Sequence, residues 1–426
     1  MKKFVYLFIF LTTLPFLLLL KDLSLGFSLY RFALVVGSVA GFVGVVLIFW
    51  QFTLGMRFVI SKFSYDTVWF NKTHQKIGKF GLVLLFVHPF LKAISYADNL
   101  WFVLIPDFSD PLWLQIGYGR LAFFLFLIVW VTSALLRKGM KYRPWLYIHY
   151  LVYPMMALVL LHARLIGTYL TSIPALELFW KILTWWFVLI VVYRLFKFLG
   201  IGNSKFQLVE KTKIEPDIFI YRFKPLGKKI IPRAGQYCHI QIKPFGEAHP
   251  FTVMESDFLT GVLTFGIKAE GKFTKTLSGL EVGTAVSLDG PYGVFTLEGH
   301  NAKPKVIIAG GIGVTPFVDL IRRFGNSQTY MFYANRFLNL AVRRDLFKKV
   351  LADRYYDLLD KEEQKGENIV QGRLTPEILA KALPGKLLSE AEIFICGSKP
   401  FYNNYKNMLL GMNIPAGRIQ YEEFGF

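Results

Sequence analysis

Residues 73–88 of the 426-residue chain read THQKIGKFGLVLLFVH, and this stretch decides how the first half of the protein folds. It begins with a basic, polar segment and continues into an apolar run typical of a membrane span. His74 and His88 lie near its two ends, fourteen residues apart. An ionisable side chain inside a membrane is costly, so an intramembrane histidine is by default a candidate functional residue.

A second apolar stretch carries a matching pair, His149 and His162, thirteen residues apart. A lone histidine would be explained as a hydrogen-bonding group between helices, but four at matching depths are not. On ideal helices the two separations correspond to rises of about 21 Å and 19.5 Å, so the pairs can meet at two levels. Both helices are predicted to run outward from the cytoplasm, which pairs His74 with His149 and His88 with His162.

Helical phase fits the first stretch better than the second. At about 100° per residue, fourteen residues return close to the same face, whereas thirteen end about 140° away. Pro154 lies between His149 and His162, and a kink there is expected to re-phase the helix. Two axial histidines on a haem iron favour electron transfer. A zinc or di-iron site would need further ligands nearby, and acids are few in this half of the chain.

The first half is predicted to be a bundle of six transmembrane helices. Hydrophobic residues form 54% of the whole chain, which contains 42 Phe. Apolar stretches long enough to cross a bilayer lie near 4–20, 30–54, 77–97, 117–136, 145–166 and 176–199. The first stretch is also compatible with a cleaved signal peptide.

Positive charge predicts how these spans are oriented. Residues 1–203 carry 19 Lys and Arg against 6 Asp and Glu, and the bases gather before the third span and between the fourth and fifth. The connection after the third span instead holds Asp98, Asp107 and Asp110. Cytoplasmic loops retain positive charge, so both termini are expected in the cytoplasm of a cell-membrane protein. The basic excess therefore indicates no nucleic-acid partner.

The second half is predicted to contain two further domains. Strand-length apolar runs near 218–223, 237–242, 251–254, 263–269 and 285–288 predict an antiparallel β-barrel over 204–303. Strands and helices alternate over 304–426, which predicts a parallel α/β domain. Cys238 and Cys396 are too few for a disulfide framework.

The stretch 306–316, VIIAGGIGVTP, reads as a buried strand, a glycine turn and a helix start. The turn holds Gly310, Gly311 and Gly313, which would let a dinucleotide approach the backbone. Thr315 is expected to cap a helix that begins at Pro316. Arg336 ends the next strand, where a cation can accept the 2′-phosphate of NADPH. A solvated Arg would look the same, so NADH stays an alternative.

The histidine pairs, followed by flavin-type and nucleotide-type motifs, resemble the transmembrane NADPH oxidase and ferric reductase family. Bacterial single-chain NADPH oxidases look most similar, and the resemblance covers nearly the whole chain. It implies a two-haem membrane domain over 1–203, with His74, His88, His149 and His162 ligating two b-type haems in the pairing given above. It also implies FAD in the barrel and NAD(P)H in the α/β domain.

The resemblance assigns several residues to the flavin. The segment HPFTV at 249–253 matches the family's flavin-binding strand, although alone it would read as an ordinary edge strand. Its assigned residues are His249, Pro250, Phe251 and Thr252, with Thr252 near flavin N5. A strand end then turns into a helix start, which suits the FAD pyrophosphate. The residues there are Lys268, Gly271 and Thr274.

Three further residues are assigned to the hydride-transfer site. Cys396 and Gly397 match a pair that the family places beside the nicotinamide, although Ser398 stands where Pro is usual. No low-pKa nucleophile is expected, because hydride transfer needs none. Phe424 is expected to stack on the flavin, and Phe426 is the alternative.

The function implied by the resemblance is an oxidase that passes electrons from cytoplasmic NAD(P)H to external oxygen and produces superoxide. Arg164, near His162, would stabilise the anionic product. It is equally explained as an interfacial side chain or a propionate partner. A ferric-chelate reductase using Asp98, Asp107 and Asp110 is one alternative, and an electron donor to an extracytoplasmic partner protein is another. No EF-hand pattern is present, and no obligatory protein activators are expected.

Overall fold

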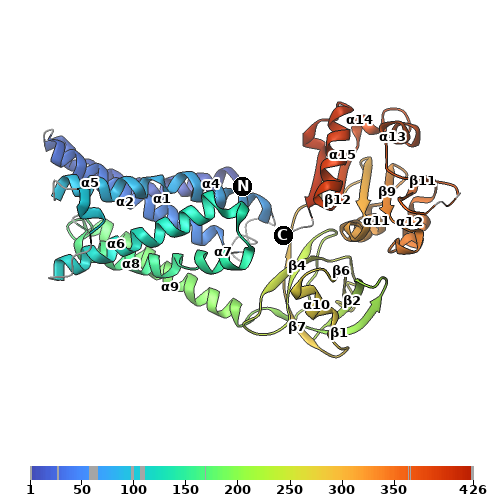
Figure 1. The fold of residues 1–426 in the computed structure, drawn as a ribbon, viewed down its shortest axis with the longest axis horizontal. Helices are drawn as coiled ribbons and strands as arrows, with labels where there is room; N and C mark the ends of the chain where they lie inside the picture. Colours follow the sequence, from blue (N-terminus) through green and yellow to red (C-terminus); the bar gives the residue numbers. More distant parts are fainter. Residues whose placement is uncertain are drawn as a thin grey trace. The chain divides into compact units, whose positions relative to one another are not determined.

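The computed structural model describes residues 2–25, 28–56, 66–96, 100–105, 111–167, 169–362, 364 and 366–423. The chain divides into two compact units, Met1–Arg194 and Leu195–Phe426. The first consists of helices, and the second contains two β-sheets with helices packed on them (Figure 1).

The first unit is a multi-pass helical bundle. Its elements are α1 (Lys2–Thr13), η1 (Leu14–Leu25), α2 (Leu29–Leu54), α4 (Thr67–Phe80), η2 (Gly81–Val83), α5 (Leu84–Tyr96), η3 (Leu100–Val103), α6 (Pro111–Trp130), η4 (Val131–Leu135), η5 (Arg137–Gly139), α7 (Tyr142–His149), α8 (Val152–Ile166) and α9 (Pro174–Phe198). Within the described residues, six segments are long and apolar enough to cross a membrane. The six predicted spans are confirmed, but the third begins at Val68 and so includes His74.

Both histidine-bearing spans are broken between their histidines. In the fifth span α7 ends at His149 and α8 begins at Val152, so the expected irregularity is present just before Pro154. Pro154 lies in the first turn of α8, where a missing N–H costs little. The third span is interrupted by the 3-10 turn Gly81–Val83, which the sequence reasoning did not anticipate.

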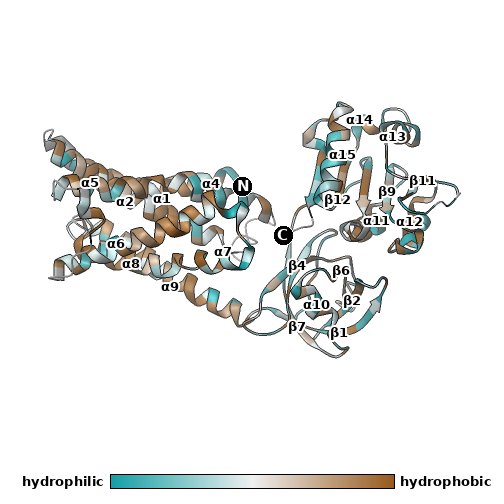
Figure 2. Ribbon diagram, in the orientation of Figure 1, coloured by the Kyte–Doolittle hydropathy of each residue, from teal (hydrophilic) through white to brown (hydrophobic). Residues whose placement is uncertain are grey.

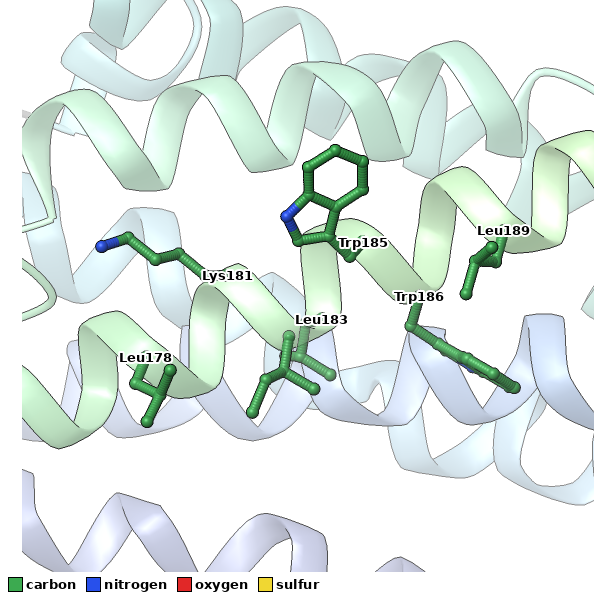
Figure 3. A pocket seen from close by; sticks show the side chains of 7 residues that line it. Leu178, Lys181, Leu183, Trp185, Trp186 and Leu189 are labelled. Atoms are coloured by element: carbon green, nitrogen blue, oxygen red, sulfur yellow. The ribbon is translucent and has the colours of Figure 1, made fainter.

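Glycines bring α2 and α5 into close contact. A Cβ added at Gly37 would lie 3.0 Å from Leu91 Cβ, and one at Gly44 would lie 2.5 Å from Leu85 Cδ2. Small residues allow such approach between transmembrane helices. On α9, exposed Leu178, Trp185 and Leu189 line a shallow apolar hollow, as expected for side chains facing lipid (Figure 3). Brown, apolar residues run along these helices in Figure 2.

The second unit begins with a seven-stranded antiparallel sheet in the order β4-β3-β7-β1-β2-β6-β5. The elements are β1 (Ser204–Lys213), β2 (Ile218–Pro225), β3 (Tyr237–Gln241), β4 (Ala248–Thr252), β5 (Glu255–Ser256), β6 (Leu263–Lys268), α10 (Lys272–Ser278), β7 (Ala285–Tyr292) and η6 (Leu297–Gly299). β1 was not predicted, because Phe206 and Leu208 are its only buried residues and the rest is largely charged or polar.

A six-stranded parallel sheet follows, in the order β11-β10-β9-β8-β12-β13. Its elements are β8 (Lys305–Gly310), η7 (Gly311–Val314), α11 (Thr315–Phe324), β9 (Thr329–Asn335), η8 (Leu338–Leu340), α12 (Arg344–Leu351), η9 (Ala352–Arg354), β10 (Tyr355–Leu359), β11 (Ile369–Gln371), α13 (Pro376–Ala382), α14 (Leu387–Glu390), β12 (Glu392–Gly397), α15 (Lys399–Gly411), η10 (Ala416–Arg418) and β13 (Ile419–Glu423). Nearly all residues of the central strands are buried, for example Ile307 and Phe394. The predicted barrel and α/β fold are confirmed.

The start of α11 differs from the prediction. Thr315 is the first residue of the helix rather than its cap, and Val314 occupies the cap position without a side-chain hydrogen bond. The reason is that η7 leads directly into α11, so Thr315 already has helical dihedral angles. Its side chain is buried and faces Gly266, where an added Cβ would lie 3.0 Å from Thr315 Cγ2.

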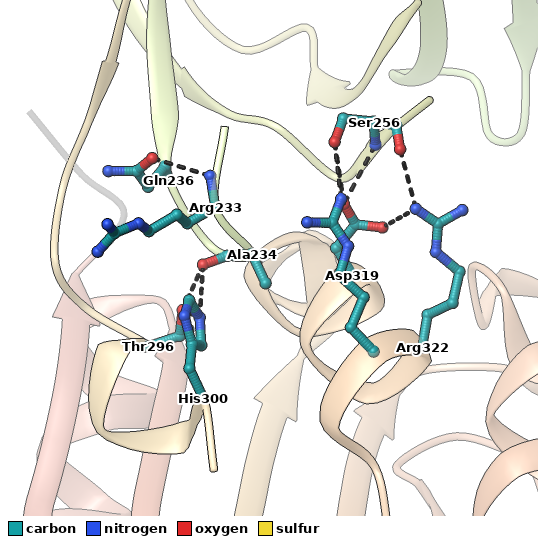
Figure 4. A network of polar contacts seen from close by, with 9 residues as sticks. Arg233, Ala234, Gln236, Ser256, Thr296, His300, Asp319 and Arg322 are labelled. Atoms are coloured by element: carbon teal, nitrogen blue, oxygen red, sulfur yellow. Dashed lines mark hydrogen bonds and ion pairs between the residues drawn. The ribbon is translucent and has the colours of Figure 1, made fainter. Parts of the chain in front are cut away.

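A polar cluster connects the barrel to the α/β domain (Figure 4). Buried Asp319 of α11 accepts a hydrogen bond from the Ser256 backbone N–H at 3.2 Å and pairs with Arg322 and Arg323 at 2.6 and 2.5 Å. Arg322 also donates to the Ser256 carbonyl at 3.0 Å. These bonds tie the short strand β5 to α11 and so fix the two halves of the second unit to one another.

Candidate functional site

The four membrane histidines meet in two pairs. The first pair is His74 of α4 and His149 of α7, whose ring centres lie 6.3 Å apart with an interplanar angle of 62°. The second pair is His88 of α5 and His162 of α8, with ring centres 6.5 Å apart and an angle of 87°. The structure therefore brings together the histidines that were paired from the sequence. The break between α7 and α8 changes the direction of His162 around the helix, so that it lies beside His88.

Each of these rings has its Nδ1 atom within hydrogen-bond distance of an oxygen. In three of them it is a backbone carbonyl: Gln51 for His74 at 3.1 Å, Gly37 for His88 at 2.8 Å and Gln115 for His162 at 3.0 Å. In His149 it is the Ser133 hydroxyl, at 3.2 Å. A carbonyl only accepts, so in those three rings Nδ1 carries the proton and Nε2 keeps its lone pair. This is the hydrogen-bond pattern of metal-binding histidines.

The spacing of the rings fits one iron between the two members of each pair. A histidine nitrogen binds a metal at about 2 Å and the ring centre lies about 1.1 Å behind it, so rings on opposite sides of one ion are about 6.2 Å apart. Edge-to-face aromatic pairs reach similar distances, but they do not require an oxygen at hydrogen-bond distance from Nδ1 in all four rings. Within the described residues, no cluster of three or more His, Cys, Asp or Glu is placed to hold a metal. Two rings at this spacing suit the two axial positions of a haem iron, whose other ligands belong to the macrocycle.

Two glycines that the sequence reasoning passed over contact the second pair. A Cβ at Gly41 would lie 2.5 Å from His88 Nδ1, and one at Gly119 would lie 2.5 Å from His162 Cε1. Real Cβ atoms do not approach other atoms so closely. The backbone of α2 and α6 therefore supports each ring directly, and only glycine leaves the rings where they are. The signal in the sequence was a glycine in an otherwise bulky apolar helix.

Arg194 is a second functional candidate that sequence reasoning missed. Its Nη2 donates to the Gly55 carbonyl at 2.5 Å, and its charge acts on both His74 and His149. Among the described residues, its Nε and the Nε2 of Gln51 are buried without a hydrogen-bond partner. Buried donors near the first pair suit a carboxylate such as a haem propionate.

The residues assigned to the flavin come from two elements that pack together. His249 of β4 stacks on Phe273 of α10, with ring centres 4.2 Å apart, and Phe251 lies against the same ring at 5.9 Å. Thr252 is buried at the end of β4. The structure thus places the predicted flavin strand beside the predicted pyrophosphate helix.

At the start of α10, Gly271 and Thr274 are hydrogen-bonded to each other, and Lys268 is paired with acidic residues. The Gly271 N–H donates to Thr274 Oγ1 at 2.9 Å, which fixes the helix start. Lys268 pairs with Glu270 and lies 3.6 Å from Asp217. The hydrogen bond from Lys268 to Glu270 raises the pKa of this lysine, so it stays charged.

The predicted nucleotide residues converge at the carboxyl ends of β8 and β12. A Cβ at Gly313 would lie 2.5 Å from the Cys396 carbonyl oxygen, and Cβ atoms at Gly310 and Gly397 would both clash with the Phe401 ring. Gly311 has φ +51°, a left-handed conformation that favours glycine. Burial raises the pKa of the Cys396 thiol well above its ordinary value, in line with the expectation that it is no nucleophile.

Other predicted residues lie apart from these contacts or beyond the described chain. Pro316 occupies the first turn of α11, and Arg336 is exposed at the end of β9. Arg164 is exposed on α8, two residues beyond His162. The predictions on Phe424, Phe426, Asp98, Asp107 and Asp110 fall outside the described residues.

Glu422 is a further residue that the sequence reasoning left unassigned. It lies on β13 opposite Cys396 of β12. Although the residue is partly exposed, its Oε2 is buried and has no hydrogen-bond partner among the described residues. Burial raises the pKa of the Glu422 carboxyl to about 7. From the sequence, an acid at the end of a strand looks solvated, so no signal marked it.

Glu422 predicts a pH dependence of stability. Its pKa rises from 4.5 in its ordinary state to about 7 in the folded protein, so the folded state binds the proton more tightly than the unfolded chain. Stability should therefore fall as pH rises from about 4.5 to 7, by at most about 3 kcal/mol. Thermal unfolding of the detergent-purified chain at pH 5.5 and 8 measures this loss. In Glu422→Gln the loss should shrink, and an unchanged loss would assign it to other groups.

Comparison with known families places this architecture in a class. Residues 40–160 match the family described as "Ferric reductase like transmembrane component". Residues 205–297 match "Oxidoreductase FAD-binding domain", and residues 307–407 match "Oxidoreductase NAD-binding domain". Fold and domain order together define an NAD(P)H-dependent flavin oxidoreductase joined to a multi-pass membrane domain. The chain belongs to the ferric reductase-like flavocytochrome family, as the resemblance predicted.

Individual relatives match about half of the chain. The reductase component of propane 2-monooxygenase from Mycolicibacterium smegmatis is 30% identical over 242 residues, which cover 52% of this chain and 67% of that protein. A flavohemoprotein from Bordetella pertussis is 23% identical over 248 residues, 53% of this chain and 61% of that protein. The FAD/NAD-binding domain of a nitric oxide dioxygenase from Vibrio cholerae is 20% identical, with a TM-score of 0.47 over 53% of this chain and 99% of that chain. This chain thus spans 61% to 67% of the length of these two curated relatives.

Proposed function

We propose that this protein is a transmembrane NADPH oxidase. Electrons from cytoplasmic NAD(P)H pass through FAD and two b-type haems to oxygen on the other side of the cell membrane, where superoxide forms. In this direction electrons leave a cytoplasm that is electrically negative, which favours transfer by about 2.3 kcal/mol per 100 mV. Both termini then lie in the cytoplasm.

The observation that carries the proposal is the pair of stacked histidine sites. In each site the two ring centres are as far apart as two histidines that bind one iron from opposite sides. The Nδ1 atoms of these rings are hydrogen-bonded to oxygens of neighbouring helices. Two such sites in one bundle would place two redox centres at successive depths of the membrane. A single haem would leave most of the thickness of the membrane uncrossed.

The residues of the nucleotide, flavin and haem sites have different roles in electron transfer. When bound, NAD(P)H would transfer a hydride to FAD, FAD would give up the two electrons one at a time and release the proton, and the haems would carry single electrons. Gly310, Gly311 and Gly313 let the dinucleotide approach the backbone of the α/β domain, and Thr252 lies on the strand that faces the flavin. The first histidine pair would hold the haem that accepts electrons from FAD, and the second pair would hold the haem that passes them to the acceptor.

A partly buried cation near the second pair favours an anionic product there. Lys92 lies one helical turn beyond His88 on α5, and its charge acts on both His88 and His162. Its ammonium group donates to Ser38 Oγ at 2.6 Å and to the Leu34 carbonyl at 3.3 Å, both neutral acceptors. The Lys92 charge therefore supplements the role proposed for Arg164, which is exposed to the surroundings of the bundle. A cation at this level stabilises superoxide as it forms.

The test is NADPH-driven electron transfer by the full chain in detergent, measured with oxygen, with cytochrome c or with ferric chelate as the acceptor. We expect oxygen uptake. We also expect reduction of cytochrome c, and superoxide dismutase should suppress this reduction. The control variant His162→Ala should show neither. Ferrous iron formed equally fast without oxygen would identify a ferric-chelate reductase instead. Haem reduction without transfer to any acceptor would indicate that a partner protein is required.

A further inference from the structure

A turn of π-helix at the end of α6 brings one hydroxyl group to the first histidine pair. The turn is Val131–Leu135, and such turns insert an extra residue and re-aim the side chains around it. Thr132 within it donates its hydroxyl to the Ile128 carbonyl at 2.7 Å, the ordinary contact of a helical threonine. Ser133 Oγ instead lies 3.2 Å from His149 Nδ1.

Trp145 holds the same two residues from α7. Its Nε1–H donates to Ser133 Oγ at 3.1 Å, and its ring stacks on His149 with centres 5.0 Å apart and an angle of 25°. The Arg137 guanidinium lies 4.4 Å from the centre of the Trp145 ring. His149 is therefore fixed by a stacked ring on one side and by a hydroxyl at Nδ1.

The direction of these hydrogen bonds follows from the donors. An indole N–H only donates, so it occupies one lone pair of Ser133 Oγ. If His149 Nε2 is to bind a metal it must be unprotonated, so Nδ1 carries the proton and donates to the second lone pair. Ser133 then accepts from both residues and directs its own proton elsewhere.

The first histidine pair has one Nδ1 partner that a side-chain substitution can remove, and the second pair has none. His74, His88 and His162 face backbone carbonyls, which no side-chain substitution removes. His149 alone among the four faces a side chain. A hydrogen bond at Nδ1 makes the imidazole a more basic ligand, which stabilises ferric over ferrous iron.

We propose that Ser133, held in place by Trp145, is the positioning residue of the haem at the first pair, orienting His149 and lowering the reduction potential of that haem. The inference rests on the proposed function, since it requires that His149 binds a haem. Removing the hydroxyl takes away the acceptor at Nδ1 and makes His149 a weaker base.

The experiment is a redox titration of the purified full chain, followed by visible spectroscopy and combined with haem quantification. In Ser133→Ala the haem assigned to the first pair should titrate at a more positive potential and be retained about tenfold less tightly, while the other keeps its potential. The variant His149→Ala, which loses the haem at the first pair, identifies which component belongs to it. Ser133→Thr, which keeps a hydroxyl, should restore the wild-type potential. Thr132→Ala, in the same turn, should change neither haem.

Two results would overturn the inference. One is a wild-type potential in Ser133→Ala with both haems present. The other is an equal shift of both haems in Ser133→Ala and Thr132→Ala, which would indicate a general loosening of the π-turn. Either result leaves the proposed function intact as long as the wild-type chain binds two haems and His149→Ala loses one. A wild-type chain without haem would reject the function itself.

Discussion

Replacing His162 with alanine should remove one haem and lower the rate of NADPH-driven oxygen reduction at least about a hundredfold. Loss of a metal ligand should lower activity more than loss of the residue that hydrogen-bonds to the ligand. The reason is that His162 forms the second pair with His88 and, within the described residues, no third metal-binding group lies there to replace it. The remaining haem at the first pair should still be reduced by NADPH. Anaerobic reduction followed by admission of air measures the two steps separately.

The matched control is Leu161→Ala on the same helix. Leu161 is 48% exposed and adjoins His162 in sequence, so its loss tests whether any truncation of α8 has the same effect. It should leave both haems and the rate unchanged. If His162→Ala kept two haems and its activity, the pairing of His88 with His162 would be rejected.

Gly119→Ala should reduce retention of the haem at the second pair by about tenfold, comparable to disturbing a supporting residue of a metal site. A methyl group at this position would lie 2.5 to 2.9 Å from three atoms of the His162 ring, so the ring must turn away. The substitution should strengthen α6 as a helix by up to about 1 kcal/mol, so helix destabilisation cannot explain the loss. Haem content per chain after gel filtration is the measurement.

Gly139→Ala serves as the control, because a Cβ there has no atom within 4 Å. It should keep both haems. Gly41→Ala should resemble Gly119→Ala, since its Cβ would lie 2.5 Å from His88 Nδ1. Full haem retention in both Gly41→Ala and Gly119→Ala would show that the rings can move without cost and that the backbone does not position them.

Much of the fold was predictable because it follows from distances fixed by physics. Bilayer thickness sets the length of the spans, and all six were recognised from composition. Histidine spacing together with the charge of the loops gave the correct partners in each pair. The parallel sheet followed from the alternation of strands and helices around the glycine turn at 310–313.

The contacts that refine the sites were not predictable in the same way. The π-turn that places Ser133 and the 3-10 turn at Gly81–Val83 depend on how neighbouring helices pack, and no local pattern signals them. Arg194 lies at the end of a span, where a basic residue is common, so the sequence did not mark it, yet its Nε is buried. Thr315 followed the rule for a helix cap, and the preceding turn η7 overrode that rule.

The most direct test of the central claim is the number of haems bound per chain, measured as pyridine haemochromogen against protein concentration. Two haems are expected in the wild-type protein, one each in His149→Ala and His162→Ala, and none in the double variant. One haem in the wild-type protein, or an unchanged number in the single variants, would contradict the assignment of the two histidine pairs.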